Sequence, residues 1–387
     1  MITGLLAGWL GALIIQVFCL LFLFARTAFR PVLDAVVTPT SAQGVTIVVC
    51  ANNEHDNLLE LLPLLTAQIY PLFEVLVIDD RSTDLSDILL EELVSLLPNL
   101  RYIRVDVEVA HVTPKKYALT IALKKATYPT VLLTDADCRP ATDRWLAGMV
   151  APLQNEATEI VLGISPYARK PGFLNFLIRS ETLFTAVQYV SLALAGRAYM
   201  GVGRNLLYRR ELFFRHKGFY SHMRIWGGDD DLFVNEAATS RNVAVSLHPD
   251  TFTTSAPKET WQAWKRQKRR HLNVGKRYKS VDKLTLGIIT GTHVLCWLLG
   301  AGVAGYVAWL ALTGQTEALL QPLLLAATCL FLLRFGLYWA IVGRISHKLG
   351  KMVRRYAIPA TDLTLAIYYC LSTLRVALTW RRKQTDW

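Results

Sequence analysis

Acidic and amide side chains directly follow three short apolar runs of this sequence. The groups are Asn52-Asn53-Glu54, Asp79-Asp80 and Asp135-Ala136-Asp137. Asp and Asn are common at helix caps and in turns, which would account for any one group. Three groups in equivalent positions instead predict a polar site assembled from several segments.

The spacing of Asp135 and Asp137 suits chemistry on a diphosphate. Alternate residues that leave a strand bring both carboxylates near one ligand, and hard oxygen ligands favour Mg²⁺ or Mn²⁺. Such a cation bridges protein and phosphate oxygens and neutralises a departing nucleoside diphosphate. We therefore expect Mg²⁺ or Mn²⁺ at this pair.

The elements that must position these groups alternate between strands and helices. β-Branched runs predict strands at Thr46–Cys50, Val75–Ile78, Tyr102–Val105 and Val131–Thr134, and helical patterns begin near Asp56, Asp84, Pro114 and Thr142. This alternation predicts an α/β fold, a parallel sheet covered by helices on both faces. Ligands bind such sheets beyond the carboxyl ends of the strands, where the strand order reverses. The three polar groups lie at those ends.

Apolar segments flank this domain. Of the 387 residues 52% are hydrophobic and 19% are charged, which is too apolar for an ordinary soluble enzyme. Three spans are expected, at Leu5–Phe24, Leu284–Leu312 and Leu319–Val342. Arg334 in the last span should face other helices or snorkel to the membrane surface rather than meet lipid. Because Ala357–Trp380 contains Asp362 and Arg375, we expect an interfacial or re-entrant helix there, with a fourth span as the alternative.

Basic residues set the orientation. Arg26 and Arg30 follow the first span, and the Thr313–Glu317 loop between the later spans has no Lys or Arg. The positive-inside rule then places the domain in the cytoplasm, and we expect a multi-pass protein of the inner (cytoplasmic) membrane. The net charge of +12 fits an anionic membrane surface or substrate. Nucleic-acid binding is not expected, because the basic residues lie beside the spans.

Seven motifs in order resemble the family 2 glycosyltransferases, whose catalytic domain has the GT-A fold. They are Ala51-Asn-Asn-Glu54, Val75-Leu-Val-Ile-Asp-Asp-Arg-Ser-Thr-Asp84, Lys115-x-x-Ala118-Leu119, Thr134-Asp-Ala-Asp137, Gly201-x-Gly-x-Asn205, Gly228-Asp-Asp-Asp231 and Gln267-x-x-Arg270. The resemblance covers about Val45 to His271 and implies a hexosyltransferase that uses a nucleotide-sugar donor, and it favours UDP-sugars. Donor contacts are implied for Glu54, Asp79 or Asp80, Lys115 or its neighbour Lys116, Asp135 and Gln267. Asp137 is implied as the principal metal ligand.

The same resemblance places a general base in the acidic run, on Asp230 with Asp229 next. An acceptor hydroxyl has a pKa far above 7, so a carboxylate must take its proton as the new bond forms. A base opposite the leaving diphosphate gives one displacement with inversion. Three adjacent carboxylates are expected to raise one another's pKa; the alternative reading is the acidic N-terminus of a helix. Arg270 is expected to hold phosphate oxygens through its fork of donors, and His271 stands where the family has a tryptophan.

These observations predict a membrane-bound glycosyltransferase with a membrane lipid as acceptor. The alternative is a processive polysaccharide synthase acting on a glycan, and a non-catalytic nucleotide-sugar sensor is a third class. Three spans are few for a polymer channel, and a sensor needs no base. The expected organisation is an anchor at 1–30, a catalytic domain at 44–257, a basic segment at 258–283, two spans at 284–343, and a basic loop with the C-terminal helix at 344–387.

Overall fold

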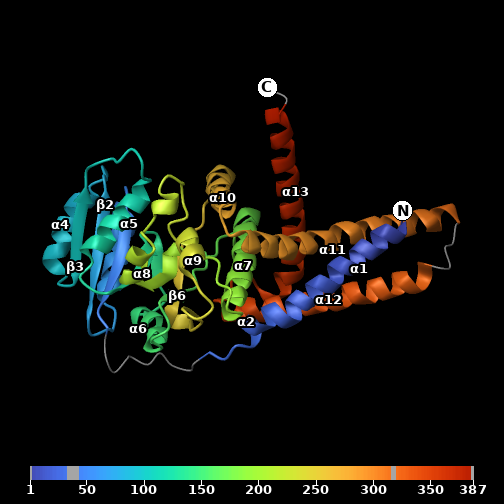
Figure 1. Ribbon diagram of the computed structural model, residues 1–387, viewed down its shortest axis with the longest axis horizontal. Helices are drawn as coiled ribbons and strands as arrows, with labels where there is room; N and C mark the ends of the chain where they lie inside the picture. The colour runs from blue at the N-terminus through green and yellow to red at the C-terminus, as the bar shows by residue number, and fades with distance from the viewer. Residues whose placement is uncertain (1, 33–42, 315–319, 385–387) are drawn as a thin grey trace.

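The computed structural model describes residues 2–32, 43–314 and 320–384 (Figure 1). An α/β domain lies at one end, and long apolar helices extend from it in a bundle. The predicted 313–317 loop falls partly outside the described residues, as do the last residues of the predicted C-terminal segment.

A seven-stranded sheet forms the centre of the domain. Its strands are β1 (Val45–Ala51), β2 (Phe73–Asp80), β3 (Leu100–Val105), β4 (Thr130–Asp135), β6 (Ile160–Leu162), β7 (Leu206–Arg209) and β8 (Val243–Val245). Their order is β3-β2-β1-β4-β7-β6-β8, and β5 (Cys138–Pro140) pairs with β9 (Thr253–Ser255) in a second, two-stranded sheet. Strands β1 to β4 are parallel to their neighbours within that group, whereas β7 is antiparallel to β4 and β6. The predicted α/β fold with a mostly parallel sheet is confirmed.

Both faces of the sheet are apolar because its strands alternate between two cores. In β1, Val48 packs into one core and Ile47 and Val49 pack into the other. Leu119 of α5 lies in the first core and Leu61 of α3 in the second. Strands covered by helices on both faces read as continuous hydrophobic runs, which is the pattern seen in the sequence.

The helices of the domain connect these strands. They are α3 (His55–Thr66), α4 (Ser86–Leu96), α5 (Pro114–Lys125), α6 (Trp145–Val150), α7 (Phe173–Leu194), α8 (Arg210–Arg215), α9 (Asp231–Ala237) and α10 (Trp261–Gly275). The longest, α7, is buried over most of its length. It also joins the domain to the bundle, because Ser191 shares a hydrogen bond of 2.7 Å with Thr27 and Ser180 one of 3.1 Å with Thr361.

Three helical segments are long and apolar enough to cross a membrane. They are residues Ile2–Phe29, which comprise α1 (Ile2–Phe18), a π-helical turn (Cys19–Phe24) and α2 (Ala25–Phe29), then α11 (Ser280–Thr313) and α12 (Gln321–Lys348). The first two extend a few residues beyond both ends of their predicted spans. α12 continues past the predicted end at Val342, and the predicted start at Leu319 lies outside the described residues. The C-terminal helix α13 (Ile358–Gln384) is not among such helices in the described chain. It crosses the bundle rather than running along it (Figure 1).

A buried polar cluster fastens α13 to the bundle. Arg334 of α12 pairs with Asp362 of α13, and both side chains are almost completely buried. The Arg334 guanidinium also donates to His293 of α11 at 3.0 Å and to Gln16 of α1 at 3.4 Å. The prediction that Arg334 faces other helices is confirmed, and the reason is that a charge at this depth requires a partner.

We expect Asp362→Asn to destabilise the protein strongly. Removing one partner of a buried ion pair leaves an uncompensated charge, which costs about 3 kcal/mol or more. Thermal unfolding in detergent should therefore begin at a clearly lower temperature than in wild type. The exposed Asp56→Asn is the matched control. The double variant Arg334→Met/Asp362→Leu should recover most of the loss, and a single variant as stable as wild type would contradict this account.

Candidate active site

The polar groups predicted from the sequence meet at one edge of the sheet. Asp79 and Asp80 end β2 and Asp135 ends β4, and both strands run parallel to β1 on its two sides. Strand order reverses at β1, so the carboxyl ends of three strands converge there. Glu54 follows β1 at the start of α3. Because these strands are parallel, their carboxyl ends lie side by side and bring together residues that are far apart in the chain.

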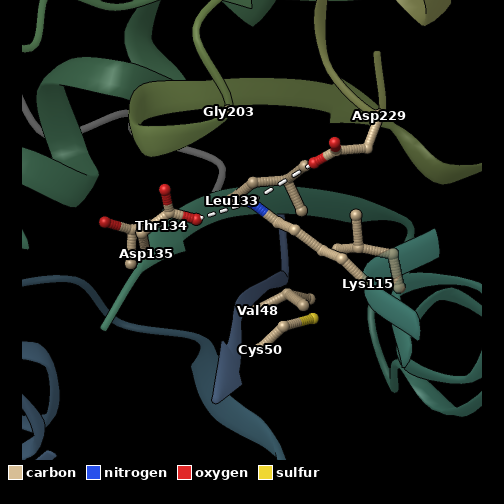
Figure 2. Close-up of a pocket in the computed structure, with 9 residues that line it drawn as sticks. Val48, Cys50, Lys115, Leu133, Thr134, Asp135, Gly203 and Asp229 are labelled. Atoms are coloured by element: carbon tan, nitrogen blue, oxygen red, sulfur yellow. Dashed lines mark hydrogen bonds and ion pairs between the residues drawn. The ribbon is translucent and has the colours of Figure 1, made fainter. Parts of the chain in front are cut away.

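Lys115 of α5 lies between two of these carboxylates. Its Nζ is 2.8 Å from Oδ1 of Asp135 and 3.3 Å from Oδ2 of Asp229. Figure 2 shows both contacts in a pocket lined also by Val48, Cys50, Leu133, Thr134 and Gly203. Partial burial acts to lower the pKa of Lys115, but the charges of Asp135, Asp229 and Asp230 outweigh it and raise the pKa well above its ordinary value. The ammonium therefore stays charged.

Lys116, the basic neighbour of Lys115, does not reach this pocket. It is buried, and its Nζ donates to the backbone oxygens of His222 at 2.6 Å and Ile225 at 2.7 Å. Burial lowers its pKa to about 8. Successive helical residues point in different directions, so Lys116 holds the loop before the acidic run while Lys115 faces the site.

The three acids of the later run have three different environments. Asp229 is almost fully buried and contacts Lys115. Asp230 is half-buried and caps α9: its Oδ2 accepts from the backbone N–H of Gly203 at 2.6 Å and its Oδ1 from that of Asp231 at 2.9 Å. Asp231 accepts from the hydroxyl of Tyr278 at 2.7 Å.

The pKa values of this run do not move together. Burial and the neighbouring charge of Asp230 raise the pKa of Asp231 well above its ordinary value. At Asp230 burial also acts to raise the pKa, but hydrogen bonds and the charge of Lys115 outweigh it and lower the pKa. The expectation that the acids raise one another's pKa therefore holds for Asp231 and is wrong for Asp230. The helix-cap reading of the run describes Asp230 correctly.

Arg204 is a site residue that the sequence analysis did not single out. Its guanidinium lies over the ring of Tyr167, 4.3 Å from the centroid, and its Nη1 is buried without a hydrogen-bond partner in the described part of the chain. Burial acts to lower the pKa of Arg204, but nearby groups, Asp135 and Asp137 among them, outweigh it and raise the pKa. The sequence could have indicated Arg204 as a site residue, because it lies inside the Gly201-x-Gly-x-Asn205 motif. In that motif a Cβ on Gly203 would lie 3.0 Å from Asp230 Oδ2, so a larger residue there would require the Asp230 carboxylate to shift.

Asp79 and Asp80 have protein partners already. Asp79 is fully buried and accepts from the backbone N–H of Ser82 at 3.2 Å and from Arg104 at 3.3 Å. Asp80 accepts from Arg81 at 2.8 Å. These contacts stabilise the turn after β2. Their predicted contact with a donor nucleotide stays a prediction.

Asp137 and Glu54 complete the acidic side of the site. Asp137 accepts from the hydroxyl of Ser255 at 3.2 Å, and Glu54 accepts from the amide of Asn57 at 2.6 Å. Burial raises the pKa of Glu54, and the charges of Asp137 and Asp135 add to this. No group of three or more metal-ligating side chains occurs among the described residues. Two carboxylates fit a Mg²⁺-like cation that takes its other ligands from a bound diphosphate and water.

The Gln267-x-x-Arg270 element lies on α10, beside the loop that carries the acids. Gln267 donates to the hydroxyl of Tyr167 at 3.1 Å. A Cβ on Gly227 would lie 3.3 Å from the Arg270 side chain, so this helix packs against the glycines that precede Asp229. The Arg270 side chain is exposed at the edge of the site.

Comparisons with known proteins agree with this architecture. Residues 46–215 match the family described as glycosyl transferase family 2. Among solved structures, the mannosyltransferase PcManGT from Pyrobaculum calidifontis in complex with GDP-Man and Mn²⁺ is similar, with 21% identity, a TM-score of 0.57, and coverage of 94% of this chain and 99% of that one. TarS residues 1–349 of S. aureus with UDP-GlcNAc shows 15% identity, a TM-score of 0.41, and coverage of 84% and 89%.

No curated protein sequence matches the chain. The family match covers β1 to β4 and α3 to α5, and it ends before Asp229 and α10. The likeness to PcManGT supports the fold of the whole chain. The predicted resemblance is therefore confirmed: residues 46–215 match glycosyl transferase family 2, and the α/β domain has the GT-A fold.

Proposed function

We propose that this protein is a membrane-bound, metal-dependent, inverting transferase that moves a hexose from a nucleotide sugar to a membrane lipid. The observation that carries the proposal is the position of α10. Its Gln267 and Arg270 reach the site, while its Trp264 packs on Tyr368 of α13 with ring centroids 5.5 Å apart. An acceptor held in the membrane would thus meet the site across a single helix.

Donor binding rests on the cations and carboxylates of the sheet edge. Mg²⁺ or Mn²⁺ held by Asp137 and Asp135 would neutralise charge on the leaving diphosphate. Mn²⁺ is present in the complex of PcManGT. Lys115 and the unpartnered nitrogen of Arg204 add positive charge on the same side. Arg270 would hold phosphate oxygens from the opposite side, on α10.

Asp230 is the proposed general base. Its backbone hydrogen bonds keep it ionised and oriented, and each uses one lone pair of one oxygen, so further lone pairs remain for an acceptor hydroxyl. No ion-pair partner of Asp230 occurs in the described chain. Asp229 is the second choice because it is more deeply buried and its charge is already balanced by Lys115.

Asp137→Asn should weaken donor binding in the presence of metal. Losing one of two protein carboxylates should lower the affinity for the metal-bound nucleotide by about tenfold or more. Calorimetric titration of UDP- and GDP-sugars with and without Mn²⁺ measures this directly. Asp56→Asn provides a charge-matched control. Equal affinity in Asp137→Asn and wild type would remove Asp137 from the metal site.

Asp230→Asn should separate binding from transfer. Because the amide takes no proton, the turnover rate should fall by about 10²-fold to 10⁴-fold. The amide keeps only one of the two backbone hydrogen bonds of Asp230, but donor affinity should stay near wild type because Asp230 is not among the proposed donor contacts. Single-turnover transfer and donor titration on the same preparation give the two quantities. Full activity in Asp230→Asn together with an inactive Asp229→Asn would move the base to Asp229.

Product analysis tests the acceptor class. Purified protein in native-like lipid would receive radiolabelled UDP- and GDP-sugars with Mg²⁺ or Mn²⁺. We expect the label in a small species that partitions into organic solvent, because a lipid acceptor keeps its hydrocarbon chain. Label in large, water-soluble material would overturn the lipid acceptor and support the polysaccharide synthase instead.

A further inference from the structure

A second cavity lies away from the acidic edge, between α7 and the connection from α12 to α13. Its volume is about 470 Å³. Four basic side chains line it: Arg169 and Lys170 from the segment before α7, Arg179 from α7, and Arg354 from the connection. No carboxylate is among the lining residues.

Three of the four basic side chains of this cavity have no acidic partner in the described part of the chain. Lys170 pairs with Glu259, but no acidic partner of Arg169, Arg179 or Arg354 occurs among the described residues. Arg179 donates from Nη2 to the backbone oxygen of Lys351 at 3.2 Å, while its buried Nε has no partner. Burial, and then the charges of Arg169 and Arg354, lower the pKa of Arg179. Like charges gathered in this way are stabilised by a bound anion.

The backbone adds donors at the same place. Gly172 also lines the cavity and precedes α7 with φ of 97°, a conformation that favours glycine. Asn175 stabilises the segment that precedes α7. Its side chain accepts from the backbone N–H of Lys170 at 3.0 Å and donates to the backbone oxygen of Ala168 at 3.1 Å. The first N–H groups of α7 are therefore held beside the arginines, and helix N-termini favour phosphate.

The surroundings indicate a lipid as the source of that phosphate. The connection begins just after α12, a helix apolar enough to span a membrane, and leads into α13. Tyr356 in the cavity wall is exposed, as is Phe173, whose ring lies 6.3 Å from that of the exposed Trp261. Aromatic side chains of this kind are enriched at membrane interfaces.

We propose that this cavity binds the phosphate of an anionic membrane lipid. Arg179 and Arg354 would hold the phosphate oxygens, the N-terminus of α7 would add backbone donors, and the acyl chains would leave past the aromatic side chains toward the membrane. The inference rests on the membrane placement in the proposed function, but it requires neither sugar transfer nor the acidic edge of the sheet.

Lipid retention tests the proposal. The full chain would be placed in nanodiscs of phosphatidylcholine with or without phosphatidic acid, extracted in mild detergent, and examined by native mass spectrometry. Wild type should keep phosphatidic acid in preference to phosphatidylcholine. The double variant Arg179→Gln/Arg354→Gln should retain less phosphatidic acid than wild type, by about tenfold or more, because two charge-assisted contacts are lost.

The matched control is Lys265→Gln/Arg269→Gln, which removes two exposed charges from α10 outside the cavity. Retention should stay at the wild-type level in this control. Equal loss in both double variants would mean general attraction to anionic lipid, and equal retention in wild type and Arg179→Gln/Arg354→Gln would mean that the cavity does not bind it. Either result overturns the proposal, as does complete displacement of the lipid by millimolar inorganic phosphate.

Folding and donor binding are checked on the same samples. Arg354→Gln alone serves if the double variant unfolds, since Arg354 is exposed and its side chain has only Tyr356 as a hydrogen-bond or cation–π partner among the described residues. Retention of phosphatidic acid should also fall in Arg354→Gln. Unchanged retention in this folded variant would contradict the proposed lipid site. Titration with a nucleotide sugar reports the acidic edge independently, so failure of the lipid site and failure of the transferase are distinguishable.

Discussion

The ammonium group of Lys115 is the contact on which the candidate site depends. It lies between the carboxylates of Asp135 and Asp229, which come from β4 and from the loop before α9. Without a cation between them, these acids would repel one another across a half-buried pocket. Lys115 thus joins β4, α5 and the loop before α9 at the acidic edge of the sheet.

A similar constraint operates among the long apolar helices. The Arg334–Asp362 pair is buried where four helices meet, and its geometry links α13 to the other three. Because an unpaired charge there is costly, the pair favours one arrangement of α13, across the bundle (Figure 1). That arrangement places Tyr368 against Trp264 of α10 and brings Arg354 beside α7. The site and the basic cavity therefore share the same supporting helices.

Long, regular segments were predictable and short ones were not. The four strands predicted from β-branched runs are present with bounds within two residues, and the three spans were visible in hydropathy. Strands β5, β6, β8 and β9 have three residues each, too few for a period-two pattern to appear. Their pairing is decided by long-range contacts, such as the register of Cys138 with Ser255.

The sequence by itself determined the family, the parallel sheet, the apolar spans and the set of acidic residues at the strand ends, because these follow from local pattern and motif order. Only the tertiary structure distinguished Lys115 from Lys116, assigned a different environment to each of Asp229, Asp230 and Asp231, and brought Arg204 to the site. The physical reason is that the direction, burial and charge balance of a side chain depend on neighbours far away in the chain. Those neighbours are brought together only by folding.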